Sequence, residues 1–290
     1  MNNFHTPVLL QEVLEFLRIE KGKKYIDATI GGGGHSFEIL KRGGIVLGID
    51  CDEEAIEYIN EKIKNQKSKI KYWERLALAQ GNFRDIGEIA RSNHFEQVSG
   101  ILFDLGVSSH QLEDAKRGFS FQKEGPLDMR MNHKLSVKAA DLINGLTKGE
   151  LYELFSKLAE EPRALAISES IIRARRISPI KTTSELVMAI SKVKSLARVF
   201  QALRIAVNDE LNNLRSALPQ AVSLLEPGGR LAVISFHSLE DRIVKNAFLD
   251  FQNKDFGTII TKKPIVPSSL EIKTNKRSRS AKLRVFSAKG

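Results

Sequence analysis

One stretch of sequence decides the fold of this chain: Asp27-Ala28-Thr29-Ile30-Gly31-Gly32-Gly33-Gly34-His35-Ser36. Residues 25–26 before it predict the end of a short strand, and residues 37–40 after it predict the first turns of a helix. A second apolar run, residues 45–49, ends in Asp50, roughly 20 residues beyond the first glycine. Strand, glycine loop, helix, strand and acid together indicate a nucleotide-binding βαβ unit, in which the acid can bind ribose hydroxyls.

The glycine loop also discriminates between nucleotide ligands. A dinucleotide fingerprint requires glycine or alanine three residues after its second glycine, and this chain has Ser36 or Phe37 there. A nucleotide-dependent oxidoreductase is therefore a disfavoured rival. Asp27, at the end of the first strand, makes the loop resemble the first motif of S-adenosylmethionine-dependent methyltransferases. A merely flexible turn is the other alternative, and the spacing to Asp50 argues against it.

Composition places the chain among ordinary globular proteins. It has 290 residues, 42% hydrophobic and 28% charged, enough for one large domain or two smaller ones. No apolar run approaches the ~20 residues of a membrane helix, and the N-terminus lacks the pattern of a secretion signal. Cys51 is the single cysteine, which excludes an internal disulfide and a cysteine-rich metal site. We expect a cytoplasmic protein with no membrane partner and no metal.

The net charge of +10 favours a polyanionic partner. Basic residues gather near the C-terminus against the single acid Glu271: Lys262, Lys263, Lys273, Lys276, Arg277, Arg279, Lys282, Arg284 and Lys289. A second group comprises Arg173, Arg175, Arg176 and Lys181. Each group could be only a solvated face, but together they favour a surface for a phosphate backbone.

The remaining apolar patterns extend the βαβ unit into a larger α/β fold. They predict helices at 8–17 and 53–63, strands within 70–79, 100–106 and 230–236, and a final antiparallel pair at 258–265 and 282–288. Between 109 and 208 helical patterns dominate, and Thr182 with Glu185 forms a capping box that opens a helix at 186–193. We therefore expect a discontinuous main domain, residues 1–108 and 209–290, interrupted by a helical subdomain at 109–208. Such an insert would overhang the ligand-binding edge of the sheet.

Further polar motifs follow the predicted strands. Asp104-Leu105-Gly106-Val107-Ser108-Ser109-His110-Gln111-Leu112 occupies the place where methyltransferases of exocyclic amines often carry an Asn- or Asp-Pro-Pro-aromatic tetrapeptide. Asp104 could serve the chemistry there, or could cap the following turn. Residues 117–121 and 125–131 combine aromatics and arginines, which would suit RNA, although packing of the insert onto the main domain is an equal alternative. Residues 235–242 add a polar cluster after the fifth strand.

These blocks together resemble one family. The resemblance rests on residues 5–10, the glycine loop, the Asp104 motif, and residues 117–131, 200–211, 235–242 and 277–284. The chain is similar to the bacterial small-subunit ribosomal RNA cytosine-N4 methyltransferases, the MraW or RsmH family. It departs from the family pattern at residues 195–199, just before the block at 200–211, and is only loosely similar at 157–166. These differences concern the shape of the insert and not the cofactor site.

The resemblance implies a class I S-adenosylmethionine-dependent methyltransferase fold, Rossmann-like, with an inserted helical subdomain. It implies methylation of the N4 amine of a decoding-centre cytidine in 16S rRNA of the small ribosomal subunit, with S-adenosyl-L-methionine as cofactor. Cofactor contacts carry over to Gly33, Gly34, His35, Asp50, Phe83, Asp104 and Gln111. Two alternatives are a methyltransferase for another nucleic-acid base and a non-catalytic RNA-binding assembly factor.

The expected chemistry needs a hydrogen-bond acceptor for the target amine. Cytosine N4 is a weak nucleophile because its lone pair is delocalised, and an acceptor for its protons would raise the electron density on nitrogen. Asp104 is the candidate catalytic residue, with Ser108 or a backbone carbonyl as possible help. His35 is interpreted as packing around the cofactor rather than transferring a proton. His110 and His237 are left without a role.

Overall fold

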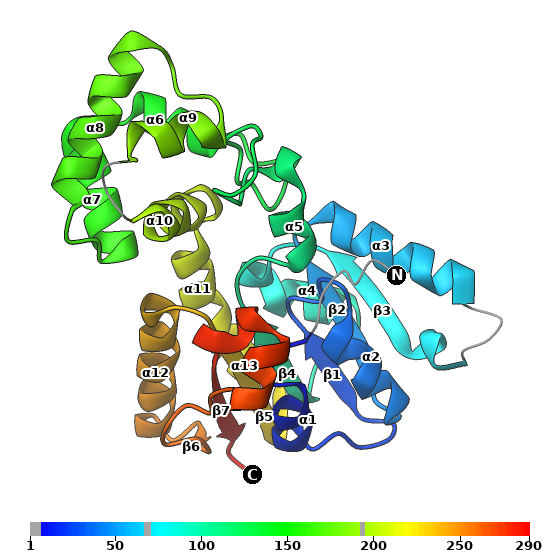
Figure 1. The fold of residues 1–290 in the computed structure, drawn as a ribbon. Helices are drawn as coiled ribbons and strands as arrows, with labels where there is room; N and C mark the ends of the chain where they lie inside the picture. Colours follow the sequence, from blue (N-terminus) through cyan, green and yellow to red (C-terminus); the bar gives the residue numbers. More distant parts are fainter. Residues whose placement is uncertain (1–6, 67–70, 192–194) are drawn as a thin grey trace. The chain divides into compact units, whose positions relative to one another are not determined.

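The structure is a computed structural model that describes residues 7–66, 71–191 and 195–290. The chain forms two compact units, which Figure 1 shows in the colours of the sequence. The first unit combines residues up to 106 with residues 211–290, and the second consists of residues 107–210. The second unit is therefore an insertion between two segments of the first.

The first unit contains a seven-stranded sheet with the strand order β3-β2-β1-β4-β5-β7-β6. The strands are β1 (Lys24–Asp27), β2 (Ile45–Asp50), β3 (Leu76–Gln80), β4 (Val98–Asp104), β5 (Leu225–Ser235), β6 (Gly257–Ile259) and β7 (Lys282–Ala288). Strands β1 to β5 are parallel, whereas β7 runs antiparallel to both β5 and β6. This topology confirms the expected α/β class and the antiparallel C-terminal pair.

Alternating side chains along the strands fill two separate cores, one on each face of the sheet. On one face, helices α1 (Leu10–Leu17), α2 (Gly34–Lys41) and α3 (Glu53–Gln66) cover a core that includes Tyr25, Val46 and Leu102. On the other face, α4 (Ile86–Ser92), α11 (Glu210–Ser223) and α12 (Ser238–Asn253) cover a core that includes Ile26, Leu47 and Phe103. Neighbouring residues of one strand thus enter different cores, as in doubly wound sheets.

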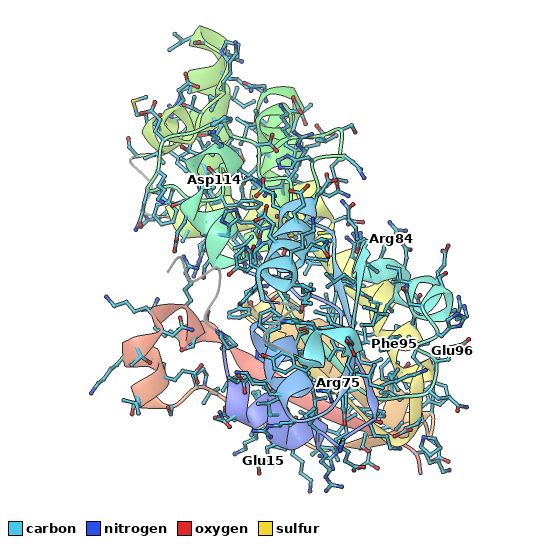
Figure 2. All side chains as sticks on the ribbon, turned by 90° about the vertical axis from the view of Figure 1, so that its right-hand side faces the viewer. Glu15, Arg75, Arg84, Phe95, Glu96 and Asp114 are labelled. Carbon is cyan, nitrogen blue, oxygen red and sulfur yellow. The ribbon has the colours of Figure 1, made fainter. Side chains whose placement is uncertain are left out.

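Helix α1 illustrates how the sequence pattern becomes packing. Val13, Leu14 and Leu17 are at most 2% exposed and face the sheet, whereas Glu15 lies on the outer side (Figure 2). On the same face of the sheet, the Arg75 guanidinium donates a hydrogen bond of 2.8 Å to the carbonyl of Leu40 at the end of α2 (Figure 2).

Three strands differ in length from the prediction, and one of them, β5, begins at Leu225 rather than at residue 230. The third strand begins only at Leu76, because residues 71–75 form a 3-10 helix; the first predicted residue, Ile70, lies outside the described residues. Strand β6 ends at Ile259, well before the predicted residue 265. Beyond it the Thr261 hydroxyl, rather than a backbone carbonyl, accepts from the Val285 amide at 2.9 Å, so regular strand pairing stops. Pairing resumes only as an isolated bridge between Ile265 and Leu283.

The second unit is helical and has its own core. Its helices are α5 (Ser109–Glu113), α6 (Ala139–Gly145), α7 (Lys148–Ala159), α8 (Ala164–Ile177), α9 (Thr183–Ala189) and α10 (Leu196–Asn208). Leu151, Phe155, Ile167 and Leu203 are completely buried in this core. The predicted capping box of Thr182 and Glu185 is present and opens α9, which ends at Ala189; residue 193, where we expected its end, lies outside the described residues. No described helix has both the length and the apolarity needed to cross a membrane.

The aromatic and basic residues of segment 117–131 serve packing within this unit. Phe119 is 6% exposed in the core, and the ring of Phe121 lies edge-on to Phe200 at 5.7 Å. The buried guanidinium of Arg117 donates to the carbonyls of Arg130 and Met131 at 3.1 and 2.9 Å. These residues therefore pack against their own helical unit, which is neither of the two alternatives expected for this segment.

Candidate functional site

Polar side chains gather where the parallel strands of the first unit end. Asp27, Asp50 and Asp104 are the last residues of β1, β2 and β4, which are neighbours in the sheet. Phe83 follows β3 by three residues, and its ring lies edge-on to Phe103 of β4 at 5.6 Å. The carboxyl ends of parallel strands are where open α/β sheets bind ligands. The first unit therefore brings six of the seven expected cofactor residues to one edge or to the loop beside it.

The loop between β1 and α2 can only be built from glycine at its turning points. Gly33 has φ +79°, and a Cβ there would lie 2.3 Å from the ring of Phe37. A Cβ on Gly34 would contact the Pro7 ring at 3.0–3.1 Å. Glycine at these positions thus lets the rings of Phe37 and Pro7 pack directly against the backbone of the loop.

Asp50 connects this loop to the second strand. Its carboxylate accepts hydrogen bonds from the amides of Gly31 (2.8 Å) and Asp52 (2.9 Å). Burial raises its pKa from 3.8 to about 6, although both hydrogen bonds act in the opposite direction. Each carboxylate oxygen keeps acceptor capacity beyond these bonds, which suits a pair of ribose hydroxyls.

This raised pKa predicts that cofactor affinity depends on pH. Hydroxyl donors bind the ionised carboxylate best, and the folded protein protonates Asp50 as the pH falls through about 6. Affinity for S-adenosyl-L-methionine should therefore be constant above pH 7 and fall about tenfold by one pH unit below the pKa. Calorimetric titration between pH 5 and 8 measures this. In Asp50→Asn the affinity should be lower and flat over this range; an unchanged slope would assign the pH dependence to another group.

A second set of polar contacts fixes the ends of β1 and β4. The Asp104 amide donates to the Thr29 hydroxyl at 2.7 Å, and the Ser36 hydroxyl donates to buried Asp27 at 2.7 Å. Burial raises the pKa of Asp27, while His35 and Ser36 counteract part of that rise. Nδ1 of His35 lies 3.7 Å from Oδ2 of Asp104. Two expected site residues, His35 and Asp104, are thereby neighbours.

The seventh expected residue, Gln111, belongs to the helical unit. It is 6% exposed and takes part in a capping box with Ser108, the N-cap residue of α5. The Gln111 side chain accepts from the Ser108 amide at 3.0 Å, and the Ser108 hydroxyl accepts from the Gln111 amide at 3.2 Å. A role of Gln111 toward the cofactor stays a prediction.

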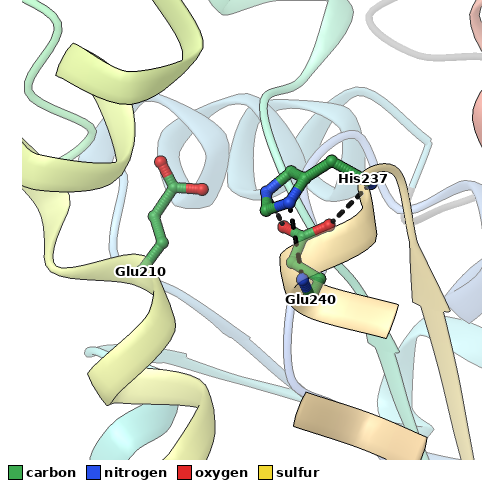
Figure 3. A group of neighbouring side chains, drawn as sticks. All are labelled: Glu210, His237 and Glu240. Carbon is green, nitrogen blue, oxygen red and sulfur yellow. Dashed lines mark hydrogen bonds and ion pairs between the residues drawn. The ribbon is translucent and has the colours of Figure 1, made fainter. Parts of the chain in front are cut away.

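His237 and Glu240 make a polar pair that the sequence analysis left without a role. His237 caps α12 in a capping box with Glu240: its Nδ1 accepts from the Glu240 amide, and the Glu240 carboxylate accepts from the His237 amide (Figure 3). Nε2 of His237 lies 3.2 Å from the same carboxylate. The spacing of a capping residue and glutamate three positions later could have revealed this helix start, as it did at Thr182.

The basic residues divide into structural and exposed members. Arg284 and Lys282 both pair with Asp241, at 2.6 and 3.2 Å, and Lys289 pairs with Asp255. In the second group, Arg175 donates to the Ile143 carbonyl at 2.6 Å. The exposed C-terminal basic residues are Lys289 and six on α13 (Ser269–Thr274) and its flanks: Lys262, Lys263, Lys273, Lys276, Arg277 and Arg279. The candidate polyanion surface is thus smaller than the sequence indicates.

Comparisons with known proteins agree over the whole length of the chain. A protein of Persephonella marina named ribosomal RNA small subunit methyltransferase H is 44% identical, covering 97% of this chain and 98% of its own. One of the same name from Thermomicrobium roseum is 46% identical, covering 98% and 93%. A solved rRNA methylase from Streptococcus thermophilus aligns with a TM-score of 0.46 and 11% identity over 96% of this chain and 95% of that chain. The model of the MraW methylase family matches residues 2–289, and the chain belongs to this family.

Proposed function

We propose that this protein transfers a methyl group from S-adenosyl-L-methionine to N4 of a decoding-centre cytidine in 16S rRNA of the small ribosomal subunit. One observation carries the chemical part of this proposal. Asp104 lies at the end of β4, and its backbone amide donates a hydrogen bond to the hydroxyl of Thr29, in the loop after β1. The substrate is supported by the names of the curated relatives, which are ribosomal RNA small subunit methyltransferases. The reaction would take place in the cytoplasm, where small subunits assemble.

S-adenosyl-L-methionine is the cofactor of this methylase, and the residues of the first unit fit it. The glycine loop at Gly33 and Gly34 would lie beside its amino-acid part, and Asp50 would hold its ribose hydroxyls. Phe83 would lie beside its base. When bound, the cofactor supplies a methyl group already activated by a sulfonium, so the protein contributes mainly proximity and alignment.

Asp104 would act on the target amine. Its side chain is only 9% exposed, and a carboxylate removed from water interacts more strongly with a developing positive charge than one in solvent. By accepting a hydrogen bond from N4, it would raise the electron density of the nitrogen and then receive its proton. The base must leave its stack to reach the methyl group, which favours an RNA segment already held open in an assembled subunit.

The exposed basic residues around α13 should contact RNA phosphates. Replacing Lys273, Lys276 and Arg279 together by Gln should weaken binding to small subunits and lower the slope of log affinity against log salt by about 1 for each lost contact. Filter binding at several salt concentrations measures both quantities. The matched control replaces Arg18, Lys21 and Arg42, which are exposed near the amino ends of β1 and β2, and should retain the wild-type slope. Equal losses in both triple variants would contradict this surface.

The function itself is tested by transfer of a tritiated methyl group. Purified protein is incubated with small subunits from cells that lack the gene, and the digested nucleosides are separated. N4-methylated cytidine at one position is the expected product. Label on another base would show the alternative methyltransferase, and absence of label despite binding would show a non-catalytic assembly factor; either result overturns the proposal.

A further inference from the structure

His35 is held in the first unit by contacts on both ring nitrogens. The residue is 4% exposed, and its Nε2 lies 3.0 Å from the backbone carbonyl of Val8. A carbonyl can only accept a hydrogen bond, so Nε2 must carry a proton. In the neutral ring the lone pair is then on Nδ1. The chain thereby fixes which nitrogen of His35 can take up a proton.

That nitrogen faces Asp104. Nδ1 lies 3.7 Å from Oδ2 of Asp104, and both side chains are more than nine-tenths buried. The other ionisable group acting here is Asp27 of β1, whose carboxyl interacts electrostatically with both His35 and Asp104. Asp50 influences Asp27 from β2, and Glu271 of α13 accepts from the amide of Leu9, next to Val8. Asp104 and Asp27 are thus the carboxyl groups that interact with the His35 ring.

The position of Asp104 relative to His35 is set by the sheet. Asp27 and Asp104 end two paired parallel strands, and the Asp104 amide is bound to Thr29, six residues before His35. On the other side, the Val8 carbonyl holds the ring from the segment before α1. The two side chains are thus held as neighbours from different elements, with Nδ1 and Oδ2 3.7 Å apart, about 0.5 Å beyond the longest ordinary N–H···O separation of about 3.2 Å.

We propose that His35 Nδ1 is the acceptor that takes the substrate proton from Asp104 and restores its carboxylate. The inference rests on the proposed function, which produces one proton in each turnover. As the bond from cytosine N4 to the methyl carbon forms, the carbon–sulfur bond breaks and its electron pair stays on sulfur. The N4 proton passes to the Asp104 carboxylate and from there to Nδ1. The imidazolium then faces a carboxylate again, and its proton leaves with product release.

This role differs from that of a ring that only fills space. A buried carboxylic acid that kept the proton would lose its attraction for the charge on N4, whereas a carboxylate beside an imidazolium keeps it. General acid–base groups of this kind typically contribute about 10²–10⁴-fold to the rate. His35 would contribute through Asp104, as a positioning and proton-accepting partner, without contacting the target base.

The tautomer can be tested without catalysis. In protein labelled with ¹⁵N-histidine, long-range proton–nitrogen spectra distinguish a protonated ring nitrogen from a bare one. We expect Nε2 of His35 to carry the proton and Nδ1 to be bare in the neutral ring, because Nε2 faces the Val8 carbonyl. A neutral ring protonated on Nδ1 would overturn the inference.

The kinetic test uses His35→Gln, whose amide can still donate to the Val8 carbonyl but cannot take up a proton. Single-turnover methyl transfer to small subunits is measured from pH 5.5 to 9, with cofactor affinity and thermal stability determined in parallel. At saturating cofactor we expect a rate at least about 10²-fold below wild type with an altered pH profile, a loss larger than any loss of cofactor affinity. The control is His94→Asn, a substitution at an exposed histidine whose left-handed backbone suits asparagine.

The outcomes separate this inference from the proposed function. If wild-type protein forms no N4-methylated cytidine, the proposed function fails. If wild type is active and His35→Gln retains its rate and its pH profile, only the proton-accepting role is overturned. A lower rate with an unchanged profile and weakened cofactor binding would show that His35 acts solely by packing, and that result also overturns it.

Discussion

Asp104→Asn should lower the rate of methyl transfer by about 10²–10⁴-fold, while the affinity for S-adenosyl-L-methionine changes far less. The amide has the size of the carboxyl and leaves the backbone bond from Asp104 to Thr29 intact, so the loop and the end of β4 keep their places. It cannot accept a proton and carries no charge to stabilise the amine as it becomes positive. Single-turnover rates and calorimetric titration of the cofactor measure the two effects separately.

Asp85→Asn is the matched control for this experiment. Asp85 lies beyond β3 in the same unit, but its side chain is 55% exposed and, among the described residues, pairs with exposed Arg84. The same change of one charge should therefore leave both the rate and the affinity at wild-type values. If Asp104→Asn lost cofactor affinity in proportion to its rate, Asp104 would be a binding residue, and its role as acceptor would be wrong.

Gly33→Ala should have the second largest effect, on cofactor binding and stability together. The methyl group would lie 2.3–2.8 Å from three ring carbons of Phe37, and the backbone has φ +79°. Overpacking costs about 1–3 kcal/mol, and a left-handed non-glycine residue costs roughly 1–2 kcal/mol more. We expect a free energy of unfolding lowered by about 2–5 kcal/mol as the sum of these two costs, with cofactor affinity at least about tenfold weaker.

Gly22→Ala separates the cost of the left-handed backbone from the cost of the clash with Phe37. Gly22 also has φ +79°, but a Cβ there meets no atom within 4 Å, so this variant should lose only the backbone contribution of roughly 1–2 kcal/mol and no cofactor affinity. Adding Phe37→Leu to Gly33→Ala removes the clashing ring carbons and should restore part of the affinity. Denaturant unfolding and cofactor titration of the four proteins provide the measurements. Equal destabilisation by both alanine variants would show that Phe37 does not constrain the loop.

The first βαβ unit could be predicted from sequence because its signals are local. The glycines at 31–34, the apolar runs on either side and the acids at 27 and 50 are adjacent in the chain, and the structure places each as expected. The same is true of Thr182 and Glu185, whose capping box spans four residues. In these places the local preference of the chain and the tertiary structure agree.

The rest of the fold and of the candidate site depends on contacts between residues that are far apart in the sequence. Whether Phe121 packs or stacks on a base is decided by Phe200, and whether Arg284 is free for phosphate is decided by Asp241. No sequence pattern indicates these partners. The neighbourhood of His35 and Asp104 likewise results from the pairing of β1 with β4, which are separated by some seventy residues. The sequence therefore indicated candidate residues for the site but not which of them face each other.

The position of β7 has a consequence for the order in which the molecule is assembled. This strand pairs with β5 on one side and β6 on the other, and its residues Leu283, Val285 and Phe286 contribute to both cores. During synthesis, everything before Lys282 emerges from the ribosome while the outer edge of β5 still has no partner. An uncovered edge of this kind attracts other chains, so the nascent protein would depend on chaperones or on rapid completion until its final strand is inserted.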